Sequence, residues 1–274
     1  MKNAIVVFTK VPKAGDIKTR LTIDRGGMLT PEEAKDVYEA CLLDVIDSCI
    51  FANCGDIYIC YNRGGDEDYL RKLLQRVSKP QEIKELFPDQ GGIFDQCIQY
   101  AADYVLRDGK LERLADSLLI IGGDLPSLQP YIIQNAMIKM IELSLSNRGR
   151  AAAQKEDGDI GAALVEASCQ EGGFSIVGFT CTTPFDFNHV FYNNDGITAL
   201  DMLVQKAIDK NIPLGVIEMV PDLDIPVDLA SHIPVIRALR LAEEYDSNVI
   251  SPKRTIKVLL EDLGLESIAA PPQR

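Results

Sequence analysis

The segment from Phe8 to Leu21 reads FTKVPKAGDIKTRL and concentrates positive charge near the start of the sequence. The stretch 10–25 has five basic and two acidic residues, whereas the whole chain of 274 residues has a net charge of −13. A small basic loop on an acidic protein indicates one small anionic ligand, and phosphate is an anion that Lys and Arg bind well. A solvated Lys-rich loop without a ligand would have the same composition, so charge alone leaves both interpretations open.

Asp124 follows the apolar run SLLIIGG and precedes Leu125 and Pro126. The two glycines before it allow the backbone to approach a ligand closely, and the proline turns the chain away. A carboxylate at this point is well placed to hold Mg²⁺, a hard cation that uses few carboxylates and adds phosphate oxygens. The alternative is a turn aspartate that caps the helix expected next.

The segment PDLDIP places Asp222 and Asp224 two residues apart, between Pro221 and Pro226. The prolines keep the segment out of a helix, and in extended backbone residues i and i+2 share a face. Two neighbouring carboxylates repel each other unless a cation lies between them. In the alternative interpretation Asp224 caps a helix that begins near Pro226, with Asp228 in its first turn. That alternative leaves Asp222 unexplained.

Phosphate-binding cations together with three carboxylates suit metal-assisted phosphoryl or glycosyl transfer. This chemistry needs positioning and charge neutralisation but no protein nucleophile, and the sequence has no evident Ser-His-Asp or Cys-His set. His189 and His232 are therefore interpreted as structural. A Walker loop ending at Lys18 would need glycine where Pro12 and Ile17 stand, and no GxGxxG follows the first strand.

The apolar periodicity predicts alternating strands and helices. Thr30, Pro31 and Glu33 form the start signal of the first helix, with a capping box. Strands are predicted over 3–9, 56–61, 82–87, 117–124, 160–167, 172–180 and 213–220. Helices are predicted over 31–49, 66–77, 94–106, 129–145, 197–210, 226–245 and 251–265, and the tail 269–274 is expected to fray.

This alternation predicts an α/β fold with a mostly parallel central sheet covered by helices. In such sheets ligands bind outside the carboxyl ends of the strands. The basic loop, Asp124 and the PDLDIP segment each follow a predicted strand. We therefore expect the three segments to meet at one edge of the sheet.

The composition is that of a globular protein, with 46% hydrophobic and 25% charged residues. The negative charge argues against a nucleic-acid binder, and the lack of an apolar window of about 18 residues predicts no transmembrane helix. The N-terminal MKNAIVVFTK is interpreted as a strand rather than a signal peptide. The seven cysteines include no CxxC, which predicts reduced core thiols in a cytoplasmic protein and no zinc site; the cysteines expected in the core are Cys41, Cys49, Cys60 and Cys97.

Five segments together resemble a known family. VVFTKVPKAGDIKTRL, a helix beginning TPEEA, IIGGDLPSLQP, EGGFSIVGF and DLDIPVDL occur in this order. The set resembles a bacterial and archaeal family of nucleotide-diphospho-sugar transferases with the GT-A fold, whose segments read FAKxPxxGxVKTRL, IGSDCPxLTP, DGGYYLIGL and DVDTPEDL. That family is similar to the 2-phospholactate and phosphoenolpyruvate guanylyltransferases of deazaflavin cofactor biosynthesis. The resemblance covers roughly residues 2–231 and implies a three-layer α/β/α GT-A-like fold.

The resemblance also implies roles for individual residues. Lys18, Arg20 and Asp124 would be catalytic, and Asp124, Asp222 and Asp224 would bind Mg²⁺ or Mn²⁺. The nucleotide- or substrate-binding residues would be Lys10, Gly15, Lys18, Thr19, Arg20, Gly122, Gly123, Glu171, Gly172 and Gly173, the Glu-Gly-Gly run lining the acceptor side. The sequence departs from the family where Gly123 replaces Ser, Leu125 replaces Cys, Glu171 replaces Asp, and GGIFDQC at 91–97 replaces a GDLGERM-like segment.

We therefore predict a GT-A-like nucleotide-binding transferase domain over 1–231 and a C-terminal helical extension over 232–274. The extension would pack on the domain or on a partner subunit, as in a homodimer, through Ile256, Leu259, Leu260 and Leu263. The predicted activity is a Mg²⁺-dependent transfer from a nucleoside triphosphate or nucleotide sugar to a small-molecule acceptor, without nucleic acid or membrane. Nucleotidyl transfer is favoured, because the Lys-Thr-Arg loop could hold a triphosphate. Glycosyl transfer from a nucleotide sugar and a catalytically silent nucleotide-binding protein are the alternatives.

Three physical expectations follow from these assignments. Replacing Lys18 and Arg20 by Ala should weaken nucleotide binding and leave thermal stability almost unchanged. Gly173→Val should block substrate use with the fold intact, because the glycines are expected to approach a ligand or a facing strand. At least one of the three aspartates should have a raised pKa, since close carboxylates repel.

Overall fold

A computed structural model of the chain describes residues 1–106, 113–154, 160–193 and 196–266. The described residues form a seven-stranded sheet with the strand order β3-β2-β1-β4-β6-β5-β7. The strands are β1 Asn3–Thr9, β2 Asp56–Tyr61, β3 Ile83–Pro88, β4 Ser117–Gly122, β5 Leu164–Ser168, β6 Phe174–Thr180 and β7 Leu214–Val216.

The sheet is mostly parallel, as predicted. β1 pairs in parallel with β2 and β4, β2 pairs in parallel with β3, and β5 with β7. Among these strands only β6 runs antiparallel to both of its neighbours, β4 and β5. The residues from Ala4 to Val7 are fully buried because both faces of the sheet are covered, which is why this strand reads as a continuous apolar run.

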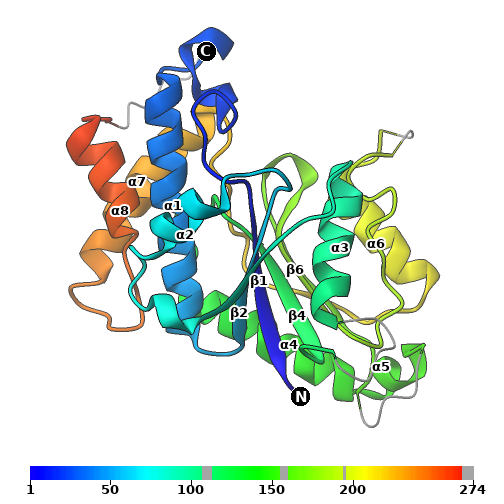
Figure 1. Cartoon of the computed structure of the whole chain (residues 1–274). Coiled ribbons are helices and arrows are strands. Elements are labelled where there is room, and N and C mark those ends of the chain that lie inside the picture. Colours follow the sequence, from blue (N-terminus) through cyan, green and yellow to red (C-terminus); the bar gives the residue numbers. More distant parts are fainter. Residues whose placement is uncertain (107–112, 155–159, 194–195, 267–274) are drawn as a thin grey trace, which may run out of the picture.

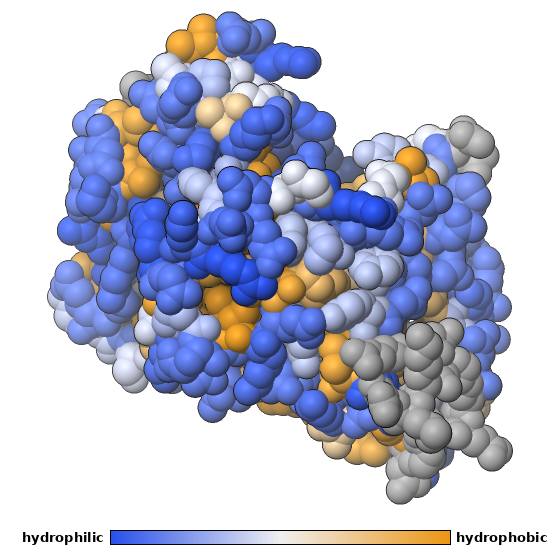
Figure 2. Space-filling view, in the orientation of Figure 1, coloured by the Kyte–Doolittle hydropathy of each residue, from blue (hydrophilic) through white to orange (hydrophobic). Residues whose placement is uncertain are grey.

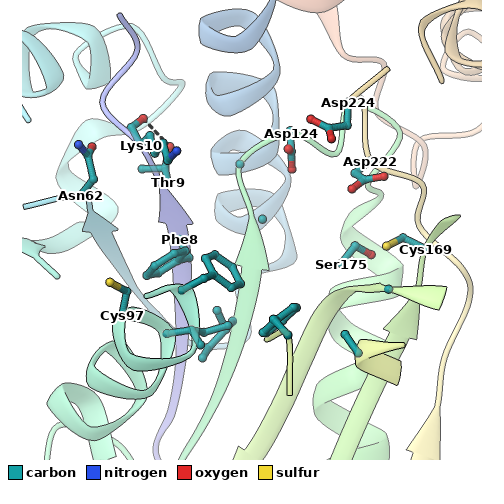
Figure 3. Close-up of a pocket in the computed structure, with 18 of the residues that line it drawn as sticks. Phe8, Thr9, Lys10, Asn62, Cys97, Asp124, Cys169, Ser175, Asp222 and Asp224 are labelled. Carbon is teal, nitrogen blue, oxygen red and sulfur yellow. Dashed lines mark hydrogen bonds between the residues drawn. The ribbon is translucent and has the colours of Figure 1, made fainter. Parts of the chain in front are cut away.

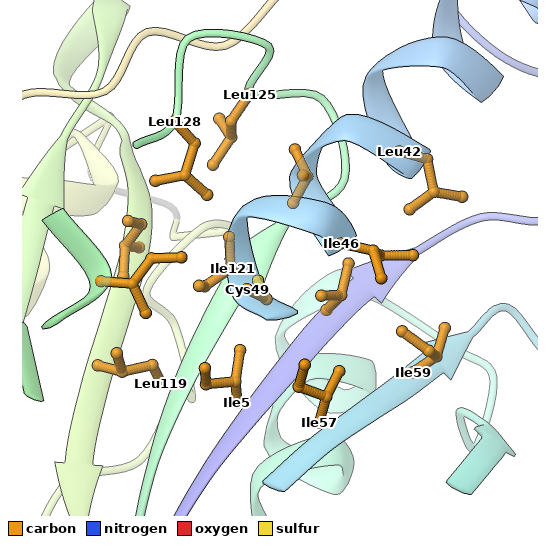
Figure 4. Close-up of a cluster of buried hydrophobic side chains, with 14 of the residues drawn as sticks. Ile5, Leu42, Ile46, Cys49, Ile57, Ile59, Leu119, Ile121, Leu125 and Leu128 are labelled. Atoms are coloured by element: carbon orange, nitrogen blue, oxygen red, sulfur yellow. The ribbon is translucent and has the colours of Figure 1, made fainter. Parts of the chain in front are cut away.

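Helices cover the sheet on both sides (Figure 1). One face packs against α1 Pro31–Ala52, α2 Glu67–Leu74 and α4 Pro130–Leu145, and the other against α3 Phe94–Leu106 and α6 Ala199–Asp209. Ile5 and Val7 point to the first face, and Ala4 and Val6 to the second. Figure 4 shows the first of these cores, where Leu42 and Ile46 of α1 lie over the sheet. The result is the predicted three-layer α/β/α arrangement.

The first helix begins as the sequence predicts. The Thr30 hydroxyl accepts a hydrogen bond from the Glu33 amide at 3.2 Å, and the Glu33 carboxylate accepts one from the Thr30 amide at 2.7 Å. Such a cap contributes about 1 kcal/mol. α1 ends at Asn53, which takes the left-handed conformation with φ 48°. The helix runs three residues beyond the predicted end at Cys49, and Ile50 and Ala52 in this part are buried.

A third apolar cluster lies on the outer side of α1, where α7 Pro226–Ala242 and α8 Lys253–Ile256 pack. Leu21, Leu29, Val37 and Leu223 join Ile256 in this cluster. The C-terminal segment therefore packs on the body of the same chain. α7 runs through the boundary predicted between 231 and 232, so the division into two domains stays a prediction. The tail 269–274 lies outside the described residues.

The structure differs from the sequence-based elements in three places. A helix over Asn147–Ala152, α5, was not predicted, because six residues are too few to show a helical period. The strand predicted over 213–220 pairs only over Leu214–Val216, after which the chain leaves the sheet toward Asp222. The last helix loses its α geometry after Ile256 and continues as a π turn over Lys257–Asp262.

Two further predictions concern the chain as a whole. Cys41, Cys49, Cys60 and Cys97 are buried free thiols, as expected. Of the helices that the structure describes, none combines the length and the apolar character that a membrane-spanning helix requires.

Candidate active site

A cavity of about 980 Å³ opens at the carboxyl ends of the strands. Figure 2 shows the surface hollowed at its upper edge, between the part with α1 and α7 and the part with α3 and α6. The loop after β1, the turn after β4, the β5–β6 connection and the segment after β7 all contribute to its lining. Every site residue predicted from the sequence lines this cavity except Gly15, which lies in the basic loop but not at the cavity wall.

The basic loop is packed against the core and is not a fully solvent-exposed loop. Ile17 and Leu21 are buried, and a 3-10 helix over Thr19–Leu21 follows directly after Lys18. Lys18 itself has φ 49° and ψ 35°, a left-handed conformation that costs a residue with a side chain on the order of 1 kcal/mol. This geometry turns the Lys18 side chain inward, where only 5% of it is exposed.

Lys18 bridges two of the predicted metal ligands. Its Nζ lies 2.5 Å from Asp124 Oδ2 and 3.4 Å from Asp224 Oδ1, and 5.7 Å from the centre of the Tyr38 ring. Burial alone would lower the pKa of Lys18, but the carboxylates of Asp124 and Asp224 outweigh it and raise the pKa above its ordinary value. The lysine therefore stays charged. Arg20, which is largely exposed, pairs with Asp224 as well.

Neither Asp124 nor Asp224 caps a helix. α4 begins after Gln129 without a side-chain cap, and Asp124 accepts its hydrogen bond from Lys18. At the start of α7, Asp228 does the capping, since its Oδ2 accepts from the amides of Asp224 at 3.0 Å and Ile225 at 2.9 Å. The alternative interpretations of both aspartates as caps are therefore wrong.

Of the three predicted metal-binding aspartates, Asp222 is the one whose carboxylate makes no hydrogen bond or ion pair with a described residue. Its backbone, however, is held by hydrogen bonds. Burial, and then the charge of Asp124, raise its pKa to about 6. The expectation of a raised pKa within the triad is thus confirmed. Figure 3 shows Asp124, Asp222 and Asp224 gathered at one end of the cavity.

Gln170 holds the Asp222 segment in place and was not identified from the sequence. Its Oε1 accepts from the Asp222 amide at 3.2 Å, and its Nε2 donates to the Asp222 carbonyl and to Asp228 Oδ1, both at 3.1 Å. The buried ring of His232 lies behind, with Nε2 3.3 Å from the Pro221 carbonyl and Nδ1 2.8 Å from the Asp228 carbonyl. This arrangement fits the structural role predicted for His232.

The predicted glycines other than Gly15 lie at the cavity, but their close neighbours are protein atoms. A Cβ on Gly123 would come 3.0 Å from the Leu42 side chain, and one on Gly172, where φ is +72°, would come 2.7 Å from Thr198. A Cβ on Gly173 would lie 2.9 Å from the Cys169 sulfur. The nearest atom is the end of a side chain that can rotate, and the nearest backbone atom, the Gln170 carbonyl oxygen, lies 3.4 Å away, so an intact fold in Gly173→Val stays a prediction.

The remaining predicted residues are open to the cavity. Lys10 is exposed, and its ammonium makes no ion pair with the parts of the chain that the structure describes. Thr19 is half-buried, and Glu171 is exposed with φ 58°, a left-handed conformation outside glycine. Tyr38, which the sequence analysis did not assign to the site, also lines the cavity; its hydroxyl is 2.7 Å from that of Thr9, and burial raises its pKa to about 12.

Within the described ranges, no three His, Cys, Asp or Glu side chains are arranged to hold a metal ion by themselves. Lys18 lies between Asp124 and Asp224 instead. Mg²⁺, however, is commonly bound through one or two carboxylates together with substrate phosphates. Asp124 and the unpaired Asp222 are oxygen donors of that kind on one cavity wall, so the residues present fit a metal that is shared with a bound phosphate.

Comparison with known proteins places the chain in a family. Residues 45–194, more than half of the chain, match the family described as uncharacterized protein conserved in bacteria (DUF2064). The chain belongs to this family. No curated protein sequence matches the chain.

Solved structures share its fold. A Desulfovibrio desulfuricans G20 protein assigned as a nucleotide-diphospho-sugar transferase superposes with a TM-score of 0.66 at 20% identity, over 94% of this chain and 95% of that one. The 4-diphosphocytidyl-2C-methyl-D-erythritol synthase of Anaerococcus prevotii DSM 20548 matches with a TM-score of 0.44 at 10% identity, over 87% of this chain and 96% of that one. The first likeness confirms the GT-A-like fold class that the sequence motifs predict.

Proposed function

We propose that the protein is a Mg²⁺- or Mn²⁺-dependent transferase that uses a nucleoside triphosphate and transfers its nucleotidyl group to a small-molecule acceptor. One observation carries the proposal: Lys10, Lys18 and Arg20 line the same cavity as Asp124 and Asp222, at the carboxyl ends of a parallel sheet. Cations of this kind bind phosphates, and the carboxylates suit the metal that accompanies them.

In the proposed reaction an acceptor oxygen forms a bond with the α-phosphorus of the nucleotide, and a proton that this oxygen carries passes to solvent. The bond between the α-phosphorus and the α,β-bridging oxygen breaks. Pyrophosphate leaves with the electron pair of this bond. Lys10, Lys18 and Arg20 would neutralise the phosphate charges, and Asp124 and Asp222 would hold the metal. The metal, when bound, supplies further neutralisation of charge on the phosphate oxygens.

Glycosyl transfer from a nucleotide sugar is the second candidate. It is favoured by the description of the Desulfovibrio desulfuricans protein, which shares the fold over almost its whole length, as a nucleotide-diphospho-sugar transferase. The same cations and carboxylates would then hold a diphosphate, and the nucleoside diphosphate would leave from the sugar. The two reactions differ in the phosphate product that is released.

Isothermal titration with nucleoside triphosphates and sugar nucleotides, with and without Mn²⁺, tests the proposal. We expect a triphosphate to bind only weakly without the metal. Lys10→Ala should lower the affinity more than tenfold, because charge-assisted contacts contribute about 1.5–3 kcal/mol. Lys13→Ala is the matched control, since Lys13 belongs to the same loop but is 74% exposed, pairs with Asp16 and does not line the cavity.

The products then distinguish the activities. Pyrophosphate release with an acceptor panel supports nucleotidyl transfer, and release of a nucleoside diphosphate from a sugar nucleotide supports glycosyl transfer. Metal-dependent binding without either product corresponds to a catalytically silent protein and contradicts the proposed activity. If no nucleotide binds, the phosphate-binding role of the loop is itself wrong.

A further inference from the structure

The cavity has a second wall that the proposed nucleotide and metal chemistry does not use. Below the aspartates it extends along the sheet face that α3 and α6 cover, where its lining changes from charged to apolar. We call this lining the aromatic wall and define it by Phe8, Phe94, Ile98, Ile120, Phe174 and Phe191. Figure 3 shows Phe8 low in the cavity, apart from the aspartate end.

The rings of the aromatic wall form one connected surface. Phe94 meets Phe8 edge-on at 5.5 Å and Phe191 edge-on at 4.7 Å between ring centres, and Phe191 lies 5.0 Å from Phe174. The buried carboxylate of Asp95 fixes the position of Phe191 by accepting a hydrogen bond from its amide at 3.0 Å. A surface assembled in this way from two strands, a helix start and a loop is ordered before any ligand arrives.

Large apolar side chains at the edge of this wall remain in water. Ile93 is 52% exposed, Phe94 38% and Tyr192 63%, and all three line the cavity. Exposed apolar groups that line a concave site next to polar groups are typical of a ligand-binding pocket. Binding of an apolar ligand group that covers these exposed side chains would therefore be favourable.

The nucleobase is not the best occupant of this wall. A base presents polar edges, whereas the aromatic wall offers mainly carbon atoms. The side chains of Asn62, Arg63 and Asp89 line another part of the same cavity, after β2 and β3, and provide an amide, a guanidinium and a carboxylate. The polar region suits the edges of a base, which leaves the aromatic wall for the second substrate.

The charge of the lining indicates what kind of second substrate fits. Four cations line the cavity, namely Lys10, Lys18, Arg20 and Arg63, against six carboxylates, namely Asp16, Asp89, Asp124, Glu171, Asp222 and Asp224. A bound divalent cation would offset the excess of two carboxylates, and the phosphates of the nucleotide would then make the site net negative, so an anionic acceptor would be repelled. An uncharged acceptor avoids this repulsion.

We propose that the aromatic wall is the acceptor subsite, and that the acceptor is an uncharged, hydroxyl-bearing molecule with an apolar ring. The proposal rests on the transferase function and adds the class of its second substrate. The ring lies on Phe94 and Phe191, and a hydroxyl faces the aspartate end, where transfer takes place. Ile93 and Tyr192 close over the ring at the edge of the cavity.

A matched pair of glucosides tests the proposal by isothermal titration. Phenyl β-D-glucoside and methyl β-D-glucoside share the same uncharged hydroxyl-bearing part and differ in the ring. Phenyl glucoside should bind at least tenfold more tightly, which corresponds to about 1.4 kcal/mol. Ile93→Ser should reduce this preference to below threefold and leave nucleotide affinity and melting temperature unchanged. Ile138→Ser is the control, because Ile138 is 55% exposed on α4 and does not line this cavity; it should keep the full preference.

Equal affinity for the two glucosides, in a protein that binds nucleotide, would overturn the acceptor assignment alone. A loss of nucleotide affinity in Ile93→Ser that matches the loss of phenyl glucoside affinity would overturn it too, because the base would then lie on the wall. Failure of the wild-type protein to bind any nucleotide would remove the transferase function, and the acceptor assignment with it.

Discussion

Replacing Lys18 by Met tests the central ion pairs of the site. Only 5% of the Lys18 side chain is exposed, while Asp124 and Asp224 are 26% and 37% exposed. Removing one partner of a fully buried ion pair costs about 3–5 kcal/mol, because the other charge is left uncompensated. Water reaches both aspartates, so we expect a smaller loss of unfolding free energy, about 1–3 kcal/mol. The melting temperature should fall by roughly 2–5 °C, because a chain of 274 residues unfolds with a large entropy change.

The sequence analysis expected the opposite, namely almost unchanged stability after loss of Lys18 and Arg20. The structure gives the two residues different roles in stability, because the Arg20 side chain is 65% exposed whereas Lys18 is buried. Arg20→Ala should therefore lower nucleotide affinity with little change in melting temperature, whereas Lys18→Met should change both.

Thermal melts of wild type, Lys18→Met and the control Lys13→Met, each with and without Mn²⁺, provide the measurement. If a divalent cation can bind Asp124, it should restore part of the stability that Lys18→Met loses. Lys13→Met should melt like the wild type under both conditions. A Lys18→Met variant that melts at the wild-type temperature would contradict the reasoning that the buried ion pair stabilises this edge of the sheet.

Two further predictions concern charges near the site and at the C-terminal segment. Asp222 has a pKa of about 6 in the folded state against an ordinary value of 3.8. Between pH 3.8 and pH 6 the folded state therefore keeps a proton that the unfolded state loses, and above pH 6 the charged carboxylate destabilises the folded state. In metal-free buffer Asp222→Asn should therefore raise the unfolding free energy by about 1–2 kcal/mol at pH 8, with the gain shrinking through pH 6 and vanishing near pH 4; a gain that does not vary with pH in urea melts would contradict this cause. Arg254→Ala should cost about 2–4 kcal/mol, because Arg254 pairs with buried Asp44 and with Asp47. Limited proteolysis should then cut the segment after Glu243 faster than in the control Arg237→Ala, which alters an exposed residue of α7, and equal rates would show that this pairing does not hold the segment.

Local signals made much of the fold predictable. The β-branched run Ile5–Val7 indicates a strand buried on both faces, and the Thr30–Glu33 pair marks the first helix by a cap that residues close in sequence complete. The site residues were predictable for a related reason. Asp124 and the PDLDIP segment each follow a strand, and a parallel sheet brings the strand ends together whatever their separation in sequence.

The parts that were missed depend on contacts between distant segments. No local pattern marks Gln170, whose amide holds Asp222 from 52 residues away. The burial of Lys18 is equally invisible in the sequence, because the same Lys-rich composition would suit an exposed loop. Phe8 and Phe94 were assigned to separate elements and Phe191 to none. Only the packing of β1 and of the segment around Phe191 against the start of α3 joins the three rings into a wall.

The oppositely charged groups of the site neutralise one another in part. The cation that would hold phosphate, Lys18, is paired with the carboxylates that would hold a metal, Asp124 and Asp224. A phosphate alone would have to take Lys18 from these carboxylates and leave them unpaired, and a metal alone would leave the buried Lys18 without a partner. A nucleotide that arrives with its metal supplies both replacements at once, since phosphate oxygens can accept from Lys18 while the metal takes a carboxylate. If the proposed function is right, nucleotide and metal should therefore bind cooperatively, and Lys18→Met should weaken that cooperativity because the exchange no longer involves the lysine.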